Sequence, residues 1–432
     1  MYLPRPLFTL RRALRQVWLR IVAILALAFL AAAVTPLLSI LMPDGVRDRF
    51  DEEAISALLS ILTGTMLGVA TFSLSVMVAA HHYAASQVTP RSHRLLREDG
   101  RTQSVLATFV GAFAYALASV VLINAGLYGP RDYAVAYIVT VAVVGFVIVA
   151  LVRWIQHLVG LGSVEATTKR VEDATETALQ DRGAAPSLGA VPSEGEVPSD
   201  SVPVLASGHG YVLHLDTAAL DALAERLAGI AHVAVQPGDW VSAGDALVHL
   251  TVPRLSVADM HEAEDAVLLS DIRSYDQDPE FGLQVMSEIA QRALSPGLND
   301  PRTAIDVIQR QMRLLLDWSD ASDPGEARFR HVRVPPLDRV RLVETAFDCI
   351  ARDGAALVEI QLAVQNAMTR LSGHSDPQIA HAACHVARRA LTRSDENLDL
   401  AEDRARVRDA ANAAHAKGAE PTRTVPDRRT GT

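Results

Sequence analysis

The sequence predicts four transmembrane α-helices followed by a cytoplasmic α+β region, in which a small β-sandwich-like segment precedes a helical bundle. Half of the 432 residues are hydrophobic, and the longest apolar runs lie within the first 160 residues. Residues 1–170 hold 15 Lys and Arg against 9 Asp and Glu, whereas the remainder holds 25 against 41, and together these give the net charge of −10. We therefore expect a basic membrane half and an acidic soluble half. An acidic soluble half argues against nucleic-acid binding, which needs cationic surface.

Four apolar stretches are long enough to span a bilayer, which takes about 20 apolar residues. They are residues 21–42, 54–80, 105–127 and 134–159. A basic start before an apolar run also occurs in signal peptides, but this first run is longer than theirs and further spans follow it. We expect a multi-pass membrane anchor.

Basic residues predict the orientation of these spans, because cytoplasmic loops are enriched in Lys and Arg. Five arginines precede the first span, and four more lie in the loop at 81–103. The outer loops at 43–53 and near 128–133 are short. This pattern predicts a bacterial inner-membrane protein with both termini in the cytoplasm.

The second span carries small and hydroxyl residues on one helical face. They recur at intervals of four, four, three and four residues: Ser60, Gly64, Gly68, Thr71 and Ser75. Such a face allows close helix packing in membranes, which is the simplest interpretation. The alternative is that faces from several subunits form a ring and line a narrow polar pore.

The sequence contains none of the motifs that we would expect of an energy-coupled transporter or an enzyme. The apolar centres of the spans contain no Asp, Glu, Lys or His, which ion-coupled transporters usually place at membrane depth. The chain also lacks a Walker loop, a dinucleotide fingerprint and a GxSxG motif. Its two cysteines, Cys349 and Cys384, build neither a disulfide framework nor a Cys-rich metal site. We expect no enzyme activity and no cofactor.

The composition divides the chain into five parts. We expect a membrane domain at 1–160, a helical exit and flexible linker at 161–202, a β-rich domain at 203–252, a helical domain at 253–417 and a disordered tail at 418–432. Helical periodicity recurs after residue 253 in the segments 258–276, 280–294, 301–318, 337–372, 376–393 and 395–416.

Residues 233–247, VAVQPGDWVSAGDAL, resemble the paired turns of biotinyl- and lipoyl-type β-sandwich domains. Those domains carry their cofactor on a lysine, and residues 203–252 contain none. The resemblance therefore implies the scaffold without the swinging arm.

A turn between two helical patterns joins the arms at 281–294 and 301–318. Pro296 and Gly297 are expected to stop the first arm, with Gly297 in a left-handed conformation, and Asp300 is expected to cap the second. Charged and polar residues gather near this turn, and we consider them as ion pairs that stiffen it or as a ligand site. They are Arg292, Asn299, Asp300, Arg302 and Asp306.

His381 and His385 stand four residues apart on a predicted helix, a spacing at which two histidines can share a zinc ion. The glutamate of the HExxH motif is missing, since the helix reads HAACH. Exposed helical histidines are the simpler interpretation.

Several of these stretches resemble one protein family. They are ALSPGLNDPRTA at 293–304 with FGL at 281–283, TFSLSVMVAA at 71–80, SQVTPR at 86–91 and FVGAFAYAL at 109–117. The chain resembles domain-of-unknown-function family 2254, a bacterial family of predicted inner-membrane proteins. The resemblance implies an architecture and no activity.

Three functions follow as hypotheses. The first is a homo-oligomeric passive channel in the lipid bilayer, lined by the second span and gated by the cytoplasmic domain. The second is a non-conducting scaffold or signalling protein whose helical domain docks a cytosolic protein partner. The third is a metal-dependent membrane enzyme, which rests on His381 and His385 alone.

Overall fold

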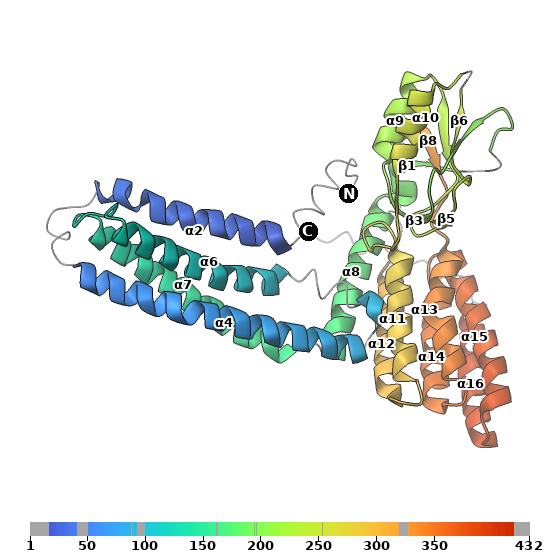
Figure 1. Ribbon diagram of the computed structural model, residues 1–432. Helices are drawn as coiled ribbons and strands as arrows, with labels where there is room; N and C mark the ends of the chain where they lie inside the picture. The colour runs from blue at the N-terminus through green and yellow to red at the C-terminus, as the bar shows by residue number, and fades with distance from the viewer. Residues whose placement is uncertain are drawn as a thin grey trace, which may run out of the picture. The chain divides into compact units, whose positions relative to one another are not determined.

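The computed structural model describes residues 17–40, 51–87, 89–92, 100–160, 163–193, 195, 197–252, 254–318 and 327–418. The chain forms two compact units, which divide at residues 167 and 168 (Figure 1). Of the tail expected at 418–432, Gly418 is the last residue of a helix, and residues 419–432 lie outside the described residues.

The first unit consists of four long helices: α2 (Val17–Ser39), α4 (Glu52–Gln87), α6 (Gly100–Asn124) and α7 (Tyr133–Gly160). Each contains a stretch long and apolar enough to cross a membrane. The predicted fold class, with four membrane helices ahead of a mixed helical and sheet region, is confirmed.

Helix α6 is the centre of this bundle, since it packs against α2, α4 and α7 (Figure 1). Its Phe109 and Tyr115 are among the largest fully buried side chains of the described residues. At Gly111 a Cβ atom would lie 2.4 Å from Cγ2 of Ile24, so the missing side chain lets α2 approach α6 closely.

A tyrosine from a distant loop supplies the hydrogen-bond donor that a proline inside α2 cannot provide. Pro36 has no N–H, so the carbonyl of Ala32 lacks its usual donor four residues along the helix. The hydroxyl of Tyr128, between α6 and α7, donates to that carbonyl at 2.5 Å. Both Ala32 and Tyr128 are buried, and a hydrocarbon environment offers no water to replace this donor.

Two small sheets form the β part of the second unit. The larger has the order β1 (Ala190–Pro192), β8 (Phe329–Val334), β4 (Ile230–Val233), β6 (Ala246–Thr251), β2 (Val202–Leu205). The smaller has the order β5 (Trp240–Val241), β3 (Gly210–Leu215), β7 (Val267–Ser270). Both edge strands of the larger sheet contain a proline, Pro192 and Pro203, which cannot donate a ladder hydrogen bond.

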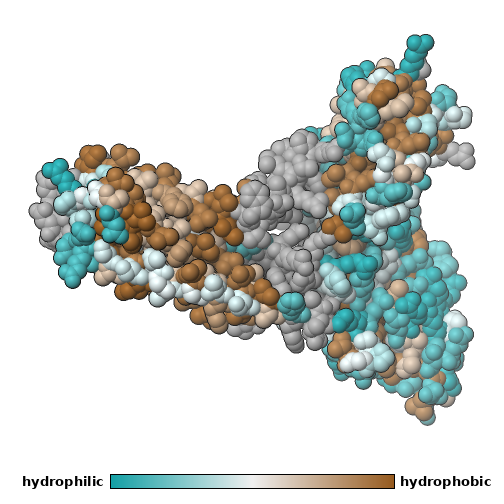
Figure 2. All heavy atoms as spheres, in the orientation of Figure 1, coloured by the Kyte–Doolittle hydropathy of each residue, from teal (hydrophilic) through white to brown (hydrophobic). Residues whose placement is uncertain are grey.

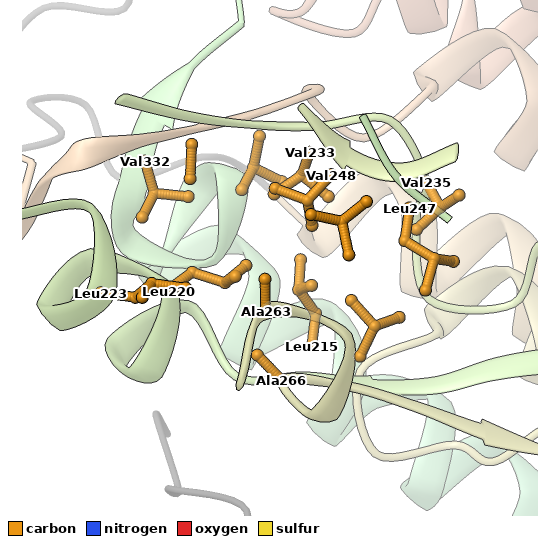
Figure 3. Close-up of a cluster of buried hydrophobic side chains, with 14 of the residues drawn as sticks. Leu215, Leu220, Leu223, Val233, Val235, Leu247, Val248, Ala263, Ala266 and Val332 are labelled. Carbon is orange, nitrogen blue, oxygen red and sulfur yellow. The ribbon is translucent and has the colours of Figure 1, made fainter. Parts of the chain in front are cut away.

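The apolar core of the β part lies between strands and two short helices, α9 (Thr217–Arg226) and α10 (Val257–Asp265). Figure 3 shows Leu220 and Leu223 of α9 facing Val332 and Val248, with Ala263 of α10 below the same cluster. Buried residues alternate with partly buried ones along β4 and along residues 331–334 of β8, so that one side of each strand faces the core.

The paired turns expected in this part are present and share one geometry. Gln236 N–H donates to Asp239 and Ser242 N–H donates to Asp245, each at the fourth turn position. Gly238 and Gly244 take the left-handed conformation between them, with φ of 97° and 95°.

Helices make up the rest of the second unit. They are α8 (Val164–Ala184), a short 3-10 turn (Pro186–Gly189), α11 (Pro279–Ala293), α12 (Pro301–Asp317), α13 (Arg339–Asp353), α14 (Val358–Leu371), α15 (Pro377–Asn397) and α16 (Ala401–Gly418). The segment expected to be helical at 337–372 is therefore two helices, which divide at Gly354.

Strands also occur where none were expected. β1 lies in the segment expected to be a flexible linker, β7 replaces the second half of the helix expected at 258–276, and β8 lies in the expected break at 319–336. Each of these strands is short and pairs with a segment distant in sequence, as β1 does with β8. Local patterning carries little information about such pairs.

Candidate functional site: the outward face of the second membrane helix

Helix α4 has two different faces. One is buried in the bundle and is mainly apolar: Ile55, Leu59, Leu62, Met66, Ala70 and Ser73. The side opposite carries the small and hydroxyl residues singled out in the sequence, Ser60, Gly64, Gly68, Thr71 and Ser75, and all five are exposed. The sequence-predicted residues therefore share one face, and it looks away from α6 and α7.

Packing among the described helices of the bundle does not explain this face. A Cβ atom added at Gly64 or Gly68 would meet nothing within 4 Å, so neither glycine accommodates another of the four described membrane helices. The hydroxyl of Thr71 donates to the carbonyls of Leu67 and Gly68, both at 3.0 Å, and that of Ser75 donates to the carbonyl of Thr71 at 3.0 Å. The hydroxyl donors of Thr71 and Ser75 are thus satisfied within α4, and the oxygen lone pairs of these two residues remain on its surface.

The surroundings of this face are strongly apolar. In Figure 2 a pale strip runs along α4 between brown surfaces. The other outward surfaces of the bundle carry large aliphatic and aromatic side chains, such as Phe29 of α2, Phe146 and Ile148 of α7. Large side chains suit lipid tails, whereas small residues are enriched where membrane helices meet.

Residues 296–300 of the turn between α11 and α12 are exposed, and hydrogen bonds within the turn hold its backbone. The N–H of Asp300 donates to the carbonyl of Ala293, and the N–H of Asn299 donates to that of Ser295. The left-handed residue is Asn299, with φ of 48°, so the expectation for Gly297 was wrong. Asn tolerates this conformation better than most residues.

The charged residues near the turn do not form one cluster. Asp300 caps α12, and its pKa is lowered because its carboxylate accepts from the hydroxyl and N–H of Thr303. Asp306 pairs with Arg310 one helical turn later, at 2.6 Å. Arg292 and Arg302 are exposed on either side of the turn. Capping and pairing along the helix account for the two carboxylates.

His381 and His385 lie side by side on α15, with ring centroids 4.5 Å apart. Both are exposed, and the pKa of His385 is lowered by desolvation and by the nearby Arg388. In the part of the chain that the structure describes, no three His, Cys, Asp or Glu residues are grouped so that they could hold a metal ion.

Two buried charge clusters in the second unit were missed in the sequence. Arg273 binds Asp278 at 2.7 Å, and a Cβ at Gly238 would lie 2.4 Å from that carboxylate. Glu172 of α8 receives Arg310 and Arg313 of α12. The position of Glu172 on the Thr- and Ala-rich face of α8 was the available signal, because a charge on a buried face needs a partner.

A family model described as Predicted membrane protein (DUF2254) matches residues 15–370. The chain belongs to this family. It is 32% identical over 277 residues to the uncharacterized proteins Mb1321c of Mycobacterium bovis and Rv1290c of Mycobacterium tuberculosis, with 58% of this chain and 50% of each relative covered. The chain thus spans about half the length of these relatives. No solved structure matches it.

Proposed function

We propose that this membrane protein assembles in the bacterial inner membrane as a homo-oligomeric passive channel, with α4 lining the pore. The observation that carries the proposal is the exposed face of Ser60, Gly64, Gly68, Thr71 and Ser75. Among the residues that the structure describes, no atom would lie within 4 Å of a Cβ at either glycine of this face. Five such residues facing lipid would forfeit packing, whereas a ring of copies places their oxygen atoms around a polar path.

Passive conduction fits the chemistry of the spans better than coupled transport. Residues 54–80 of α4 contain no acidic or basic side chain, and the other spans have apolar centres. The excess of Arg at the N-terminus and at 81–103 supports cytoplasmic termini, with the second unit inside the cell as a vestibule or gate. No cofactor or enzymatic step is part of this proposal.

The test is ion flux through purified protein in sealed liposomes, comparing the parent with Gly64→Leu and Thr71→Leu. Each leucine adds bulk to the exposed face, so we expect flux to be lost while the protein still assembles. Thr65→Leu is the matched control, because Thr65 is an exposed threonine of the same helix whose hydroxyl also bonds its own backbone, and it lies off this face. Normal flux in assembled Gly64→Leu and Thr71→Leu proteins would refute the pore.

A non-conducting scaffold is the second candidate, and the turn after α11 favours it. Residues 296–300 are all exposed, and Leu298 presents 41% of its surface to solvent on a backbone fixed by hydrogen bonds. A rigid, exposed turn of this kind suits a docking cytosolic protein. Crosslinking to one partner that is lost in Asn299→Ala and Leu298→Ser proteins, without flux in liposomes, would support it.

A further inference from the structure

Helix α8 follows the last membrane helix almost directly. Helix α7 ends at Gly160 and α8 begins at Val164, and from Thr168 onward α8 belongs to the second unit. Helix α8 is therefore the first element of the second unit that follows the membrane helices in the chain.

The buried face of α8 is unusually polar. From Thr168 onward, its buried polar residues are Thr168, Glu172, Thr175 and Arg182, and its buried apolar residues are Val171, Ala178 and Leu179. The neighbouring α11 buries Phe281, Leu283, Val285, Met286 and Ile289 instead. Polar groups regain hydrogen bonds to water when a face is exposed, whereas aliphatic groups do not, so α8 can separate at a lower cost than α11.

An ion-pair cluster provides the main specific contact of that face. The Glu172 side chain is 2% exposed, and its carboxylate accepts from Arg310 at 2.7 Å and from Arg313. Lys169 lies 3.4 Å from the same carboxylate. Although burial opposes ionisation, the two arginines hold the pKa of Glu172 below its ordinary value. A buried carboxylate with these partners fixes the register of α8 on α12.

Two further contacts bind α8 to the same pair of helices. A Cβ at Gly282 of α11 would lie 2.0 Å from Oγ1 of Thr175, so the two helices touch closely at this point. The indole N–H of Trp318, next to the end of α12, donates to the carbonyl of Leu179 at 2.8 Å. Glu172, Thr175 and Leu179 of α8 therefore all contact α11, α12 or the residue next to the end of α12.

We propose that α8 is a detachable coupling helix, which docks on α11 and α12 through Glu172 and separates from them while α13–α15 stay folded. Docking would link the state of the membrane helices to the cytoplasmic unit, and separation would uncouple them. This coupling by α8 does not depend on the proposal that the protein conducts ions. Helices in proteins owe most of their stability to tertiary packing, so we expect the separated 21-residue helix to lose its own backbone protection as well.

Hydrogen exchange by mass spectrometry on the full chain in lipid nanodiscs tests this proposal. In the parent, we expect amides of residues 164–184 to exchange faster than those of α13 and α15. Glu172→Gln keeps the shape but removes the charge that both arginines bind, so exchange in α8 should rise about tenfold or more. Exchange in α13–α15 should stay unchanged.

Glu176→Gln is the matched control, because Glu176 lies on the exposed side of α8 and bonds Gln180 of the same helix. It should leave α8 exchange as in the parent. The proposal is overturned if Glu172→Gln does not change α8, if it accelerates α8 and α13–α15 together, or if the control has the same effect.

Discussion

Replacing Tyr128 by Phe should destabilise the membrane half by about 1 to 1.5 kcal/mol. The hydroxyl is 2.5 Å from the Ala32 carbonyl, and Pro36 removes the backbone donor that would otherwise satisfy it. An unsatisfied buried acceptor costs about 1–3 kcal/mol in soluble proteins. Interhelical hydrogen bonds in membranes average about 0.6 kcal/mol and reach about 1.7, so the lower part of the soluble range applies.

If the Tyr128 hydroxyl stabilises the protein by bonding the carbonyl of Ala32, the effect of Tyr128→Phe must depend on Pro36. The variant Pro36→Ala tests this dependence. An alanine in place of this proline restores the N–H, and the carbonyl of Ala32 then has a donor within its own helix. In this background the cost of Tyr128→Phe should fall to about half or less, because the remaining lone pair of the carbonyl matters little.

The assay is reversible unfolding of the purified chain in mixed micelles, with four proteins compared in a double-mutant cycle. Tyr133→Phe is the control, since its hydroxyl is bonded to Glu52 at the exposed N-terminal end of α4 and should contribute little. Equal costs of Tyr128→Phe in the parent and in the Pro36→Ala background would show that the hydroxyl does not act through the Ala32 carbonyl.

Three further results are expected. Gly282→Ala should loosen α8 from α11 and lower the free energy of unfolding by about 1–3 kcal/mol, because the new methyl overlaps Thr175; a thermal melt of unchanged midpoint would contradict this. The pKa of Glu172 is lowered in the folded chain, so its contribution to the free energy of unfolding is present at neutral pH and is lost as the pH falls below about 4. In Glu172→Gln, the free energy of unfolding should therefore decrease less steeply with falling pH in this acidic range than in the parent. Metal analysis of purified protein should find no stoichiometric zinc, since His381 and His385 have no third ligand among the described residues, and a bound zinc that disappears in His381→Ala would overturn that expectation.

The membrane helices could be predicted because hydropathy is a local property of the chain. A run such as 134–159 has no alternative to spanning or burial. The stripe on α4 was also visible, but its direction was not, since periodicity shows two faces without saying which one meets α6. The buried face of Ile55 and Leu59 settles this only when the neighbouring helices are in place.

Partners distant in sequence account for most of what was missed. Strand β1 is three residues long and pairs with β8 about 140 residues later, so neither segment carries a strong strand pattern of its own. The same holds for Glu172, whose partner Arg310 lies 138 residues away. In contrast, the pair of Asp306 and Arg310 follows from four-residue helical spacing and could have been chosen over Arg302.

The bond between Tyr128 and Ala32 also bears on how the protein is made. The two residues are 96 positions apart, so at synthesis rates of about 5–20 residues per second Ala32 precedes its donor by about 5–20 s. Helix α6, which α2 and α4 pack against, is likewise translated after both of them. The first two spans therefore leave the ribosome before α6, against which both pack, has been synthesised. Until the third and fourth spans are made, the first two must be held next to the insertion machinery. We expect the yield of the assembled bundle to depend more on this retention by the insertion machinery than on the hydrophobicity of the individual spans.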